Sequence, residues 1–236
     1  MEYNSVATAQ PAVTQEQLDQ GLRTYLLGIY NKMTLALVLT GAVAYWASSA
    51  LLPLMQSPLW IVMALLPLAF ILVLSFGINR LSVPMATAVF YLFAAVMGVS
   101  LSTIFVLYTT ASIAKVFFIS AATFASASIY GYTTKRDLTS MGGFLIMGAV
   151  GILIAGIVNI WLQSSIMGFA ISCIAVLVFT GLTAYDTQKL REEYLSQGAV
   201  YGFDSAAKSS IFGALELYLD FINIFAHLMN LLGDRK

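Results

Sequence analysis

Apolar residues fill seven stretches of the chain, and polar connections separate them. The stretches cover residues 33–52, 59–78, 83–108, 113–132, 141–162, 166–185 and 211–232. A helix needs about 20 mainly apolar residues to cross the hydrocarbon core of a bilayer, and each stretch reaches that length. The pattern therefore predicts an all-α polytopic membrane protein with seven transmembrane helices.

Composition supports the same fold class and limits the domain organisation. Of the 236 residues, 60% are hydrophobic and only 9% are charged, whereas a soluble domain of this length carries more surface charge. Most connections are too short to hold a soluble catalytic domain. We expect a polar tail over residues 1–27, with an amphipathic lead-in near 22–30, and a single seven-helix transmembrane domain over 28–236. The glycine-rich stretch 141–162 predicts close helix packing.

Basic residues are divided unevenly between the two sides of the membrane. With seven spans, the side of the N-terminus receives eight of them and the opposite side three: Arg23, Lys32, Arg80, Lys135, Arg136, Lys189, Arg191 and Lys208 against Lys115, Arg235 and Lys236. The positive-inside rule therefore places the N-terminus in the cytoplasm and the C-terminus outside. The equal totals of 11 acidic and 11 basic residues argue against nucleic acid as a partner. The partner that the apolar stretches imply is the lipid bilayer.

The last apolar stretch carries a polar stripe. Its members follow one another at spacings of 4, 3, 4 and 3 residues: Glu216, Asp220, Asn223, His227 and Asn230. At about 100° per residue they fall within about 80° of the helix circumference. Ionisable groups are costly inside a bilayer and usually face a cavity, a partner or an ion path. We therefore expect the last helix to be central, with Glu216, Asn223 and His227 as candidates for a cation path.

Asp186, just after the sixth stretch, is the expected partner of Asp220. If the sixth helix continues toward Tyr194, both carboxyl groups lie in the cytoplasmic half of the membrane. Two carboxylates in a site of low dielectric constant cannot both ionise cheaply, so they are expected to share a proton and to act as a pH sensor. Simpler roles stay open: Asp220 capping a backbone or pairing with Arg80, Glu216 exposed to water, and His227 as a satisfied polar residue.

Three segments resemble the transmembrane Bax-inhibitor-motif family in its bacterial form. They are GYTTKRDLTSMGGFL at 131–145, TGLTAYDTQ at 180–188 and ALELYLDFIN at 214–223. The resemblance implies a seven-helix bundle with the last helix central and a pH-dependent calcium leak, hence a bacterial inner membrane. It also implies that Asp186 and Asp220 form a proton-sharing pair that meets calcium transiently, and that Arg80 is a latch. Calcium and protons are then the species handled, with no tightly bound cofactor.

Two alternatives compete with a leak channel. The first is an intramembrane aspartyl protease, because two aspartates lie on successive helices. However, no Gly-x-Gly precedes Asp220 and no Pro-Ala-Leu follows it. The second is a non-conducting membrane regulator whose acids serve stability alone. A zinc hydrolase is disfavoured because His227 is the chain's single histidine. We therefore expect a protein that is not an enzyme.

Overall fold

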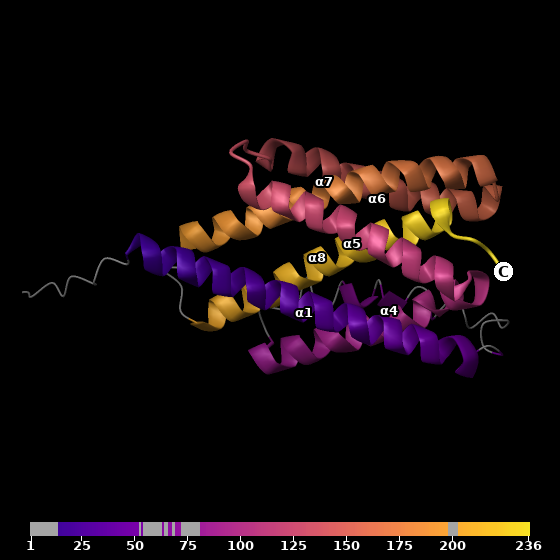
Figure 1. Cartoon of the computed structure of the whole chain (residues 1–236), viewed down its shortest axis with the longest axis horizontal. Helices are drawn as coiled ribbons and strands as arrows, with labels where there is room; N and C mark the ends of the chain where they lie inside the picture. Colours follow the sequence, from indigo (N-terminus) through magenta and orange to yellow (C-terminus); the bar gives the residue numbers. More distant parts are fainter. Residues whose placement is uncertain are drawn as a thin grey trace, which may run out of the picture.

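The computed structural model describes residues 14–51, 53, 63, 66–67, 69–71, 81–197 and 203–236. Six long helices lie in this part of the chain (Figure 1): α1 (Gln15–Ala50), α4 (Val83–Leu107), α5 (Thr110–Thr133), α6 (Thr139–Leu162), α7 (Ser165–Gln197) and α8 (Phe203–Leu232). All six are long and apolar enough to cross a membrane. The prediction of an all-α polytopic membrane protein is confirmed. The predicted span 59–78 lies mostly outside the described residues.

The helices run roughly along the long axis of the molecule. α1 begins at the left in Figure 1, and the chain ends at the right. We call these the N-terminal end and the C-terminal end of the bundle. The α5–α6 connection lies at the N-terminal end, and the α6–α7 connection lies at the C-terminal end.

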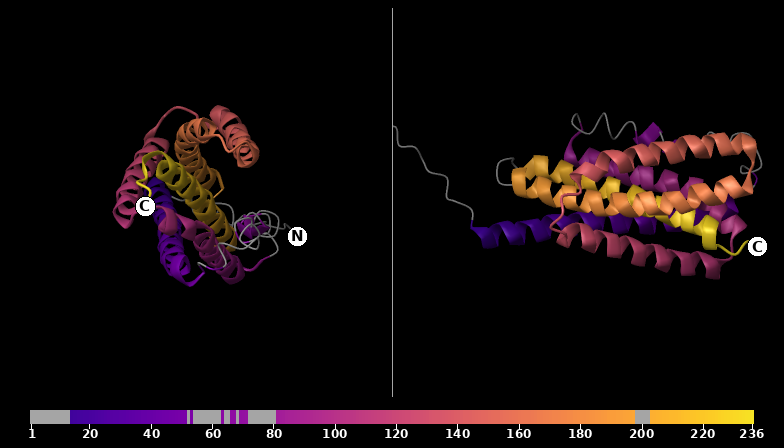
Figure 2. Two further views of the ribbon diagram at one scale, coloured as in Figure 1. Left: turned by 90° about the vertical axis from the view of Figure 1, so that its right-hand side faces the viewer. Right: turned by 90° about the horizontal axis from the view of Figure 1, so that it is seen from above.

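Helix α8 is the centre of the bundle. It packs against α1, α4, α5 and α7, and the end-on view in Figure 2 shows it inside the other helices. In the most apolar window of α8, 61% of the residues are buried, against at most 39% in any other described span. Large side chains from several faces of the helix are fully buried, including Ile211, Leu217, Tyr218 and Ile224. The prediction of a central last helix is confirmed.

Helix α1 begins earlier than the sequence pattern suggested. Thr14 caps it in a capping box with Gln17, so that two otherwise unpaired backbone donors are satisfied. Leu22, Leu26 and Ile29, in the lead-in predicted near 22–30, are buried in the main hydrophobic core, and residues 15–21 extend the same helix ahead of it. This extension was not predicted because residues 15–21 are mostly polar. At 1.5 Å per residue, α1 is about 54 Å long and extends beyond the hydrocarbon core.

The glycines of α6 mediate the expected close packing only in part. A Cβ atom added at Gly143, Gly151 or Gly156 would meet no described atom within 4 Å. Only 11% of the apolar window of α6 is buried, so most of this helix faces outward. Gly142 and Gly148 do pack against α7, because a Cβ atom at Gly142 would overlap the ring of Tyr185 and one at Gly148 would lie 3.3 Å from Val178.

Candidate functional site

Asp186 and Asp220 face each other across the contact between α7 and α8. Helix α7 continues to Gln197, so Asp186 lies well inside it. The two side chains are only 8% and 4% exposed, and their carboxyl groups lie within hydrogen-bonding range of each other. Carboxylate oxygens only accept hydrogen bonds, so a bond between the two groups requires that one carries a proton. The geometry therefore suits a shared proton.

The carboxyl group of Asp220 has fewer hydrogen-bond partners than it can accept. The hydroxyl of Thr183 lies within hydrogen-bonding range of the Asp220 carboxyl group, but it also donates to the carbonyl of Phe179 at 2.8 Å. Asp220 Oδ2 is buried and has no hydrogen-bond partner among the described residues. A buried polar atom without a partner is costly, and it often marks a place where an ion, a proton or water is handled.

A second charged pair lies one helical turn closer to the N-terminal end. Lys189 Nζ contacts Glu216 Oε1 at 2.8 Å in an ion pair between α7 and α8. The ammonium group also lies 6.0 Å from the centre of the Phe212 ring. Glu216 Oε2 is buried and has no hydrogen-bond partner among the described residues. The sequence singled out Glu216 but treated Lys189 only as one of several basic residues.

Aromatic side chains cover this pair on the side of the N-terminal end. Tyr25 of α1 shares a hydrogen bond of 2.9 Å with the hydroxyl of Ser209. Its ring stacks on Tyr194 with centroids 5.1 Å apart. Beyond them lies a cavity of about 580 Å³ whose lining includes the polar side chains of Gln20, Thr24 and Lys32. Tyr25 and Tyr194 thus lie between this cavity and the charged groups.

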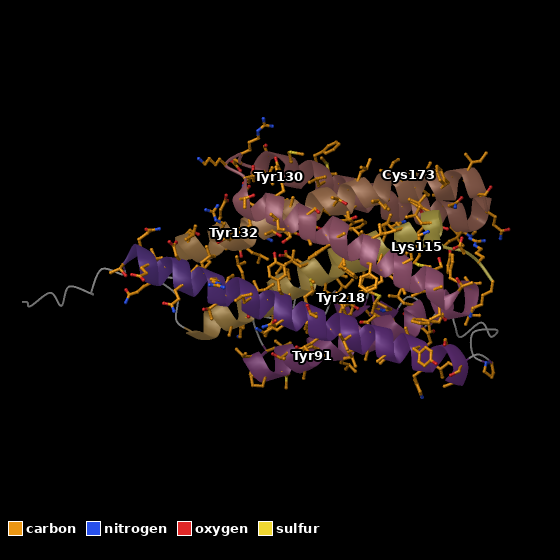
Figure 3. All side chains as sticks on the ribbon, in the orientation of Figure 1. Tyr91, Lys115, Tyr130, Tyr132, Cys173 and Tyr218 are labelled. Carbon is orange, nitrogen blue, oxygen red and sulfur yellow. The ribbon has the colours of Figure 1, made fainter. Side chains whose placement is uncertain are left out.

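Other faces of α8 at the level of the aspartates pack into the hydrophobic core. Tyr218 is fully buried at the middle of the molecule (Figure 3). Its hydroxyl lies 2.7 Å from the hydroxyl of Thr40, which in turn lies 2.9 Å from the carbonyl of Ala94. This node joins α1, α4 and α8. Phe221 of α8 packs against Phe124 of α5, with ring centroids 5.7 Å apart.

The remaining stripe residues make ordinary polar contacts. His227 Nδ1 lies 3.2 Å from Ser172 Oγ, and Asn230 Nδ2 donates to the same oxygen at 2.9 Å. Both contacts join α8 to α7. Asn223 instead donates to the carbonyl of Leu219 in its own helix at 2.8 Å. The structure therefore brings Asp186, Glu216 and Asp220 together and leaves Asn223 and His227 apart from them.

Two further sequence predictions concern a latch and a metal. Arg80 lies outside the described residues. Over the part of the chain that the structure describes, no group of three or more His, Cys, Asp or Glu side chains is arranged to hold a metal ion. A transient contact of Asp186 and Asp220 with calcium stays a prediction.

The comparisons with known proteins identify the family. A family model described as "Inhibitor of apoptosis-promoting Bax1" matches residues 22–236. The chain belongs to the Bax inhibitor family. It is 44% identical over 220 residues to the inner membrane protein YbhL of Escherichia coli, covering 92% of this chain and 94% of that protein. It is 43% identical over 221 residues to a protein of Rickettsia prowazekii, covering 92% of each chain. A membrane protein of Streptococcus pyogenes is 32% identical over 227 residues, covering 94% of this chain and 97% of that protein.

The three segments that resemble the Bax inhibitor family meet in space around Asp186. Gly131 of α5 lies against the backbone of Ala184, where an added Cβ atom would overlap the carbonyl oxygen. Gln188 holds the α5–α6 connection, since it donates to the Arg136 carbonyl at 2.8 Å and accepts from the Leu138 amide at 2.7 Å. Sequence reasoning missed this role, although Gln188 lies within the second segment.

The α5–α6 connection also contains a side chain that stabilises the first turn of α6. The Thr139 amide donates to Asp137 Oδ1 at 2.8 Å. Hydrogen bonds from the side chain and the backbone of Thr139 hold the pKa of the Asp137 carboxyl below its usual value. Asp137 therefore stays ionised beside the first turn of α6, where the helix dipole favours negative charge.

Proposed function

We propose that this protein is a passive, pH-sensitive cation leak with calcium as the permeant ion, gated by Asp186 and Asp220. The observation that carries the proposal is the pair of buried carboxyl groups within hydrogen-bonding range of each other, where Asp220 Oδ2 lacks a described partner. The name of the relative YbhL supports an inner-membrane location. The division of basic residues supports a cytoplasmic N-terminal end.

The arrangement of side chains fits a closed state. When the aspartate pair holds one proton, a hydrogen bond between the two groups keeps α7 and α8 together. The Lys189–Glu216 pair and the stacked rings of Tyr25 and Tyr194 lie on the side of the N-terminal end. The core around Tyr218 packs another face of α8 at the same level. With one proton on the aspartates, the three acids and Lys189 carry one net negative charge.

Loss of the shared proton opens the gate in this proposal. Two ionised carboxylates repel each other at short range, which favours a state with α7 and α8 further apart. Their freed oxygens are hard ligands of the kind that calcium prefers. A change of about 1.4 kcal/mol in the balance between the two states shifts their ratio about tenfold. Modest changes of pH near neutrality are therefore expected to change the leak.

The test is calcium influx into liposomes. The full chain is reconstituted in calcium-free vesicles that contain a fluorescent calcium indicator, and influx after addition of external calcium is recorded between pH 6 and 8. We expect influx above that of empty vesicles, rising with pH, and loss of the pH dependence in Asp186→Asn and Asp220→Asn. Asp234→Asn, which changes an exposed acid at the C-terminal end, is the matched control and keeps the wild-type profile.

Two other results would replace the proposal. If influx equals that of empty vesicles while Asp220→Leu lowers the unfolding temperature, the acids serve structure, and a non-conducting regulator is favoured. If both asparagine variants keep the wild-type rate and pH profile, the aspartate pair is not the gate. The Bax inhibitor family is not a family of known enzymes, so we propose no protease activity.

A further inference from the structure

A large cavity separates α1 from α5 at the N-terminal end of the bundle. Its volume is about 800 Å³, which lies within the usual range for small-molecule sites. Leu22, Leu26 and Phe124 form a buried apolar back wall, while Leu27 and Ile129 at its edges are 51% and 64% exposed. The cavity therefore opens sideways from an apolar wall, toward the place of the lipid.

Cationic groups lie near both sides of the opening. Arg23 of α1 lines the cavity, is exposed and forms no ion pair within the described residues. On the other side, Tyr132 of α5 lines the cavity (Figure 3), and the guanidinium group of Arg191 lies 5.7 Å from the centre of its ring. Asp19 also lines the cavity and is the acidic group among the lining residues. The charges of the lining residues Arg23 and Asp19 balance, and Arg191 beside Tyr132 adds one positive charge at the opening.

The cavity lies near the N-terminal end of the bundle, where we expect the boundary between headgroups and acyl chains. Its α1 wall runs from Asp19 to Tyr30, in the part of α1 that extends toward and beyond the bilayer surface. Tyr30 and Tyr132 are aromatic residues with a polar tip, which are typical of this boundary. Apolar residues thus lie beside the chain region, and the arginines lie where phosphate groups are found.

We infer that this cavity binds one anionic phospholipid of the leaflet at the N-terminal end. An acyl chain lies between α1 and α5, against Leu22, Leu26 and Phe124, and the headgroup phosphate lies between Arg23 and Arg191. Arginine suits this role because its planar fork of donors matches the geometry of a phosphate. The positive opening favours lipids with a net negative headgroup over zwitterionic lipids.

The floor of the cavity is polar. The Tyr30 hydroxyl is hydrogen-bonded to the Ser128 hydroxyl, and Ser128 Oγ lies 3.1 Å from Thr187 Oγ1. Tyr30 and Ser128 line the cavity, while Thr187 lies on α7. These contacts link α1, α5 and α7 at the floor of the cavity.

Native mass spectrometry of the full chain in detergent tests this inference. The purified protein is titrated with palmitoyl-oleoyl phosphatidylglycerol or with the corresponding phosphatidylcholine, and the bound lipid is counted. We expect one tightly held phosphatidylglycerol, with an affinity about tenfold higher than that of phosphatidylcholine. Ala125→Trp, which fills the cavity from α5, is expected to weaken binding at least about tenfold, a change of about 1.4 kcal/mol.

Matched variants distinguish weaker lipid binding caused by a filled cavity from weaker binding caused by misfolding. Ala111→Trp changes an exposed alanine of the same helix at the C-terminal end and should leave binding unchanged. Leu27→Trp fills the cavity from the opposite wall and should weaken binding even if Ala125→Trp fails to fold. Arg23→Gln should remove most of the preference for the anionic lipid, whereas Arg23→Lys should keep part of it.

Several outcomes would overturn the inference. Equal binding of both lipids by the wild type would remove the role of the arginines. Unchanged phosphatidylglycerol binding in folded Ala125→Trp and Leu27→Trp would place the lipid elsewhere. A dimer that both tryptophan variants dissociate would show that a second copy of the chain covers the cavity.

Discussion

Charged side chains of α7 and α8 form two layers near the N-terminal end of the bundle. Asp186 and Asp220 form the inner layer, and Lys189 and Glu216 form the outer layer one turn away. In the proposed leak, a cation that approaches the aspartates from this end would pass the Lys189 ammonium group. Lys189 would then compete with that cation for the same carboxylates.

Replacing Lys189 tests this competition. In Lys189→Met, Glu216 loses its partner, and the entrance becomes more negative, which raises the local cation concentration. We expect calcium influx into liposomes to rise on the order of tenfold, equivalent to about 1.4 kcal/mol. Lys189→Arg should stay near wild type, and Lys189→Met combined with Glu216→Gln, which restores the net charge, should return toward it. A rate for Lys189→Met at or below that of wild type would contradict the competition.

Tyr218 provides a second test at this scale, independent of conduction. Tyr218→Phe removes the hydroxyl that bonds to Thr40 and keeps the ring contacts with Phe90 and Phe93. Hydrogen bonds between membrane helices contribute about 0.6 kcal/mol on average and up to about 1.7 kcal/mol. We expect a loss of stability in this range, measured by thermal unfolding in detergent. Tyr45→Phe, at a residue that is 68% exposed, should not change the unfolding temperature, and equal effects of both variants would refute the role of the node.

Individual residues of the site could be predicted to different degrees. Asp186 and Asp220 could be paired because successive helices usually lie side by side and both residues fall near the same end. Asn230, a member of the stripe on α8, bonds to Ser172 of α7. Asn223, a member of the same stripe, bonds instead to the carbonyl four residues earlier in its own helix. Periodicity identifies the polar face of a helix, but it does not identify the hydrogen-bond partner of each side chain on that face.

At the scale of elements, glycines of α5 and α6 have opposite surroundings. A Cβ atom at Gly131 would overlap the backbone of Ala184 in α7, whereas a Cβ atom at Gly143 would meet no described atom within 4 Å. Gly131→Ala must push α5 away from α7, which we expect to cost about 1 to 3 kcal/mol. Gly143→Ala should change stability by no more than about 0.5 kcal/mol. Thermal unfolding in detergent measures both, and equal effects would show that α5 and α7 are not in close contact at Gly131.

Gly131 and Gly143 also show why the sequence predicted the helices better than it predicted how they pack. Apolar stretches of about 20 residues located the spans because the bilayer fixes that length. Small residues permit close approach but do not show whether a helix or lipid lies beside them, so the prediction for stretch 141–162 holds at Gly142 and Gly148 and fails at the other glycines. The start of α1 at Gln15 was missed because residues 15–21 are mostly polar.

At the scale of the whole molecule, the C-terminal end of α8 is anchored to the α4–α5 connection. Its C-terminal end continues into a short segment that lies on the α4–α5 connection. The Thr109 amide donates to the Asp234 carbonyl at 3.1 Å, and the Lys236 amide donates to the Leu107 carbonyl at 2.9 Å. The Asp234 amide also donates to Ser112 Oγ at 2.9 Å. A movement that separates α7 from α8 is therefore expected to occur at the N-terminal end, with the C-terminal end as its fixed point.

Deleting residues 234–236 tests this fixed point. The deletion removes the backbone hydrogen bonds of the segment and the Arg235 guanidinium group that lies 5.9 Å from the centre of the Tyr108 ring. We expect amide hydrogen exchange in residues 228–232 to rise on the order of tenfold, because local opening becomes about 1.4 kcal/mol easier. Exchange in residues 211–216, at the other end of α8, should stay unchanged. Ser112→Ala, which removes a single contact, should give a smaller rise at the same place. Faster exchange along the whole of α8 would instead mean that the segment stabilises the entire helix and does not act as a local anchor.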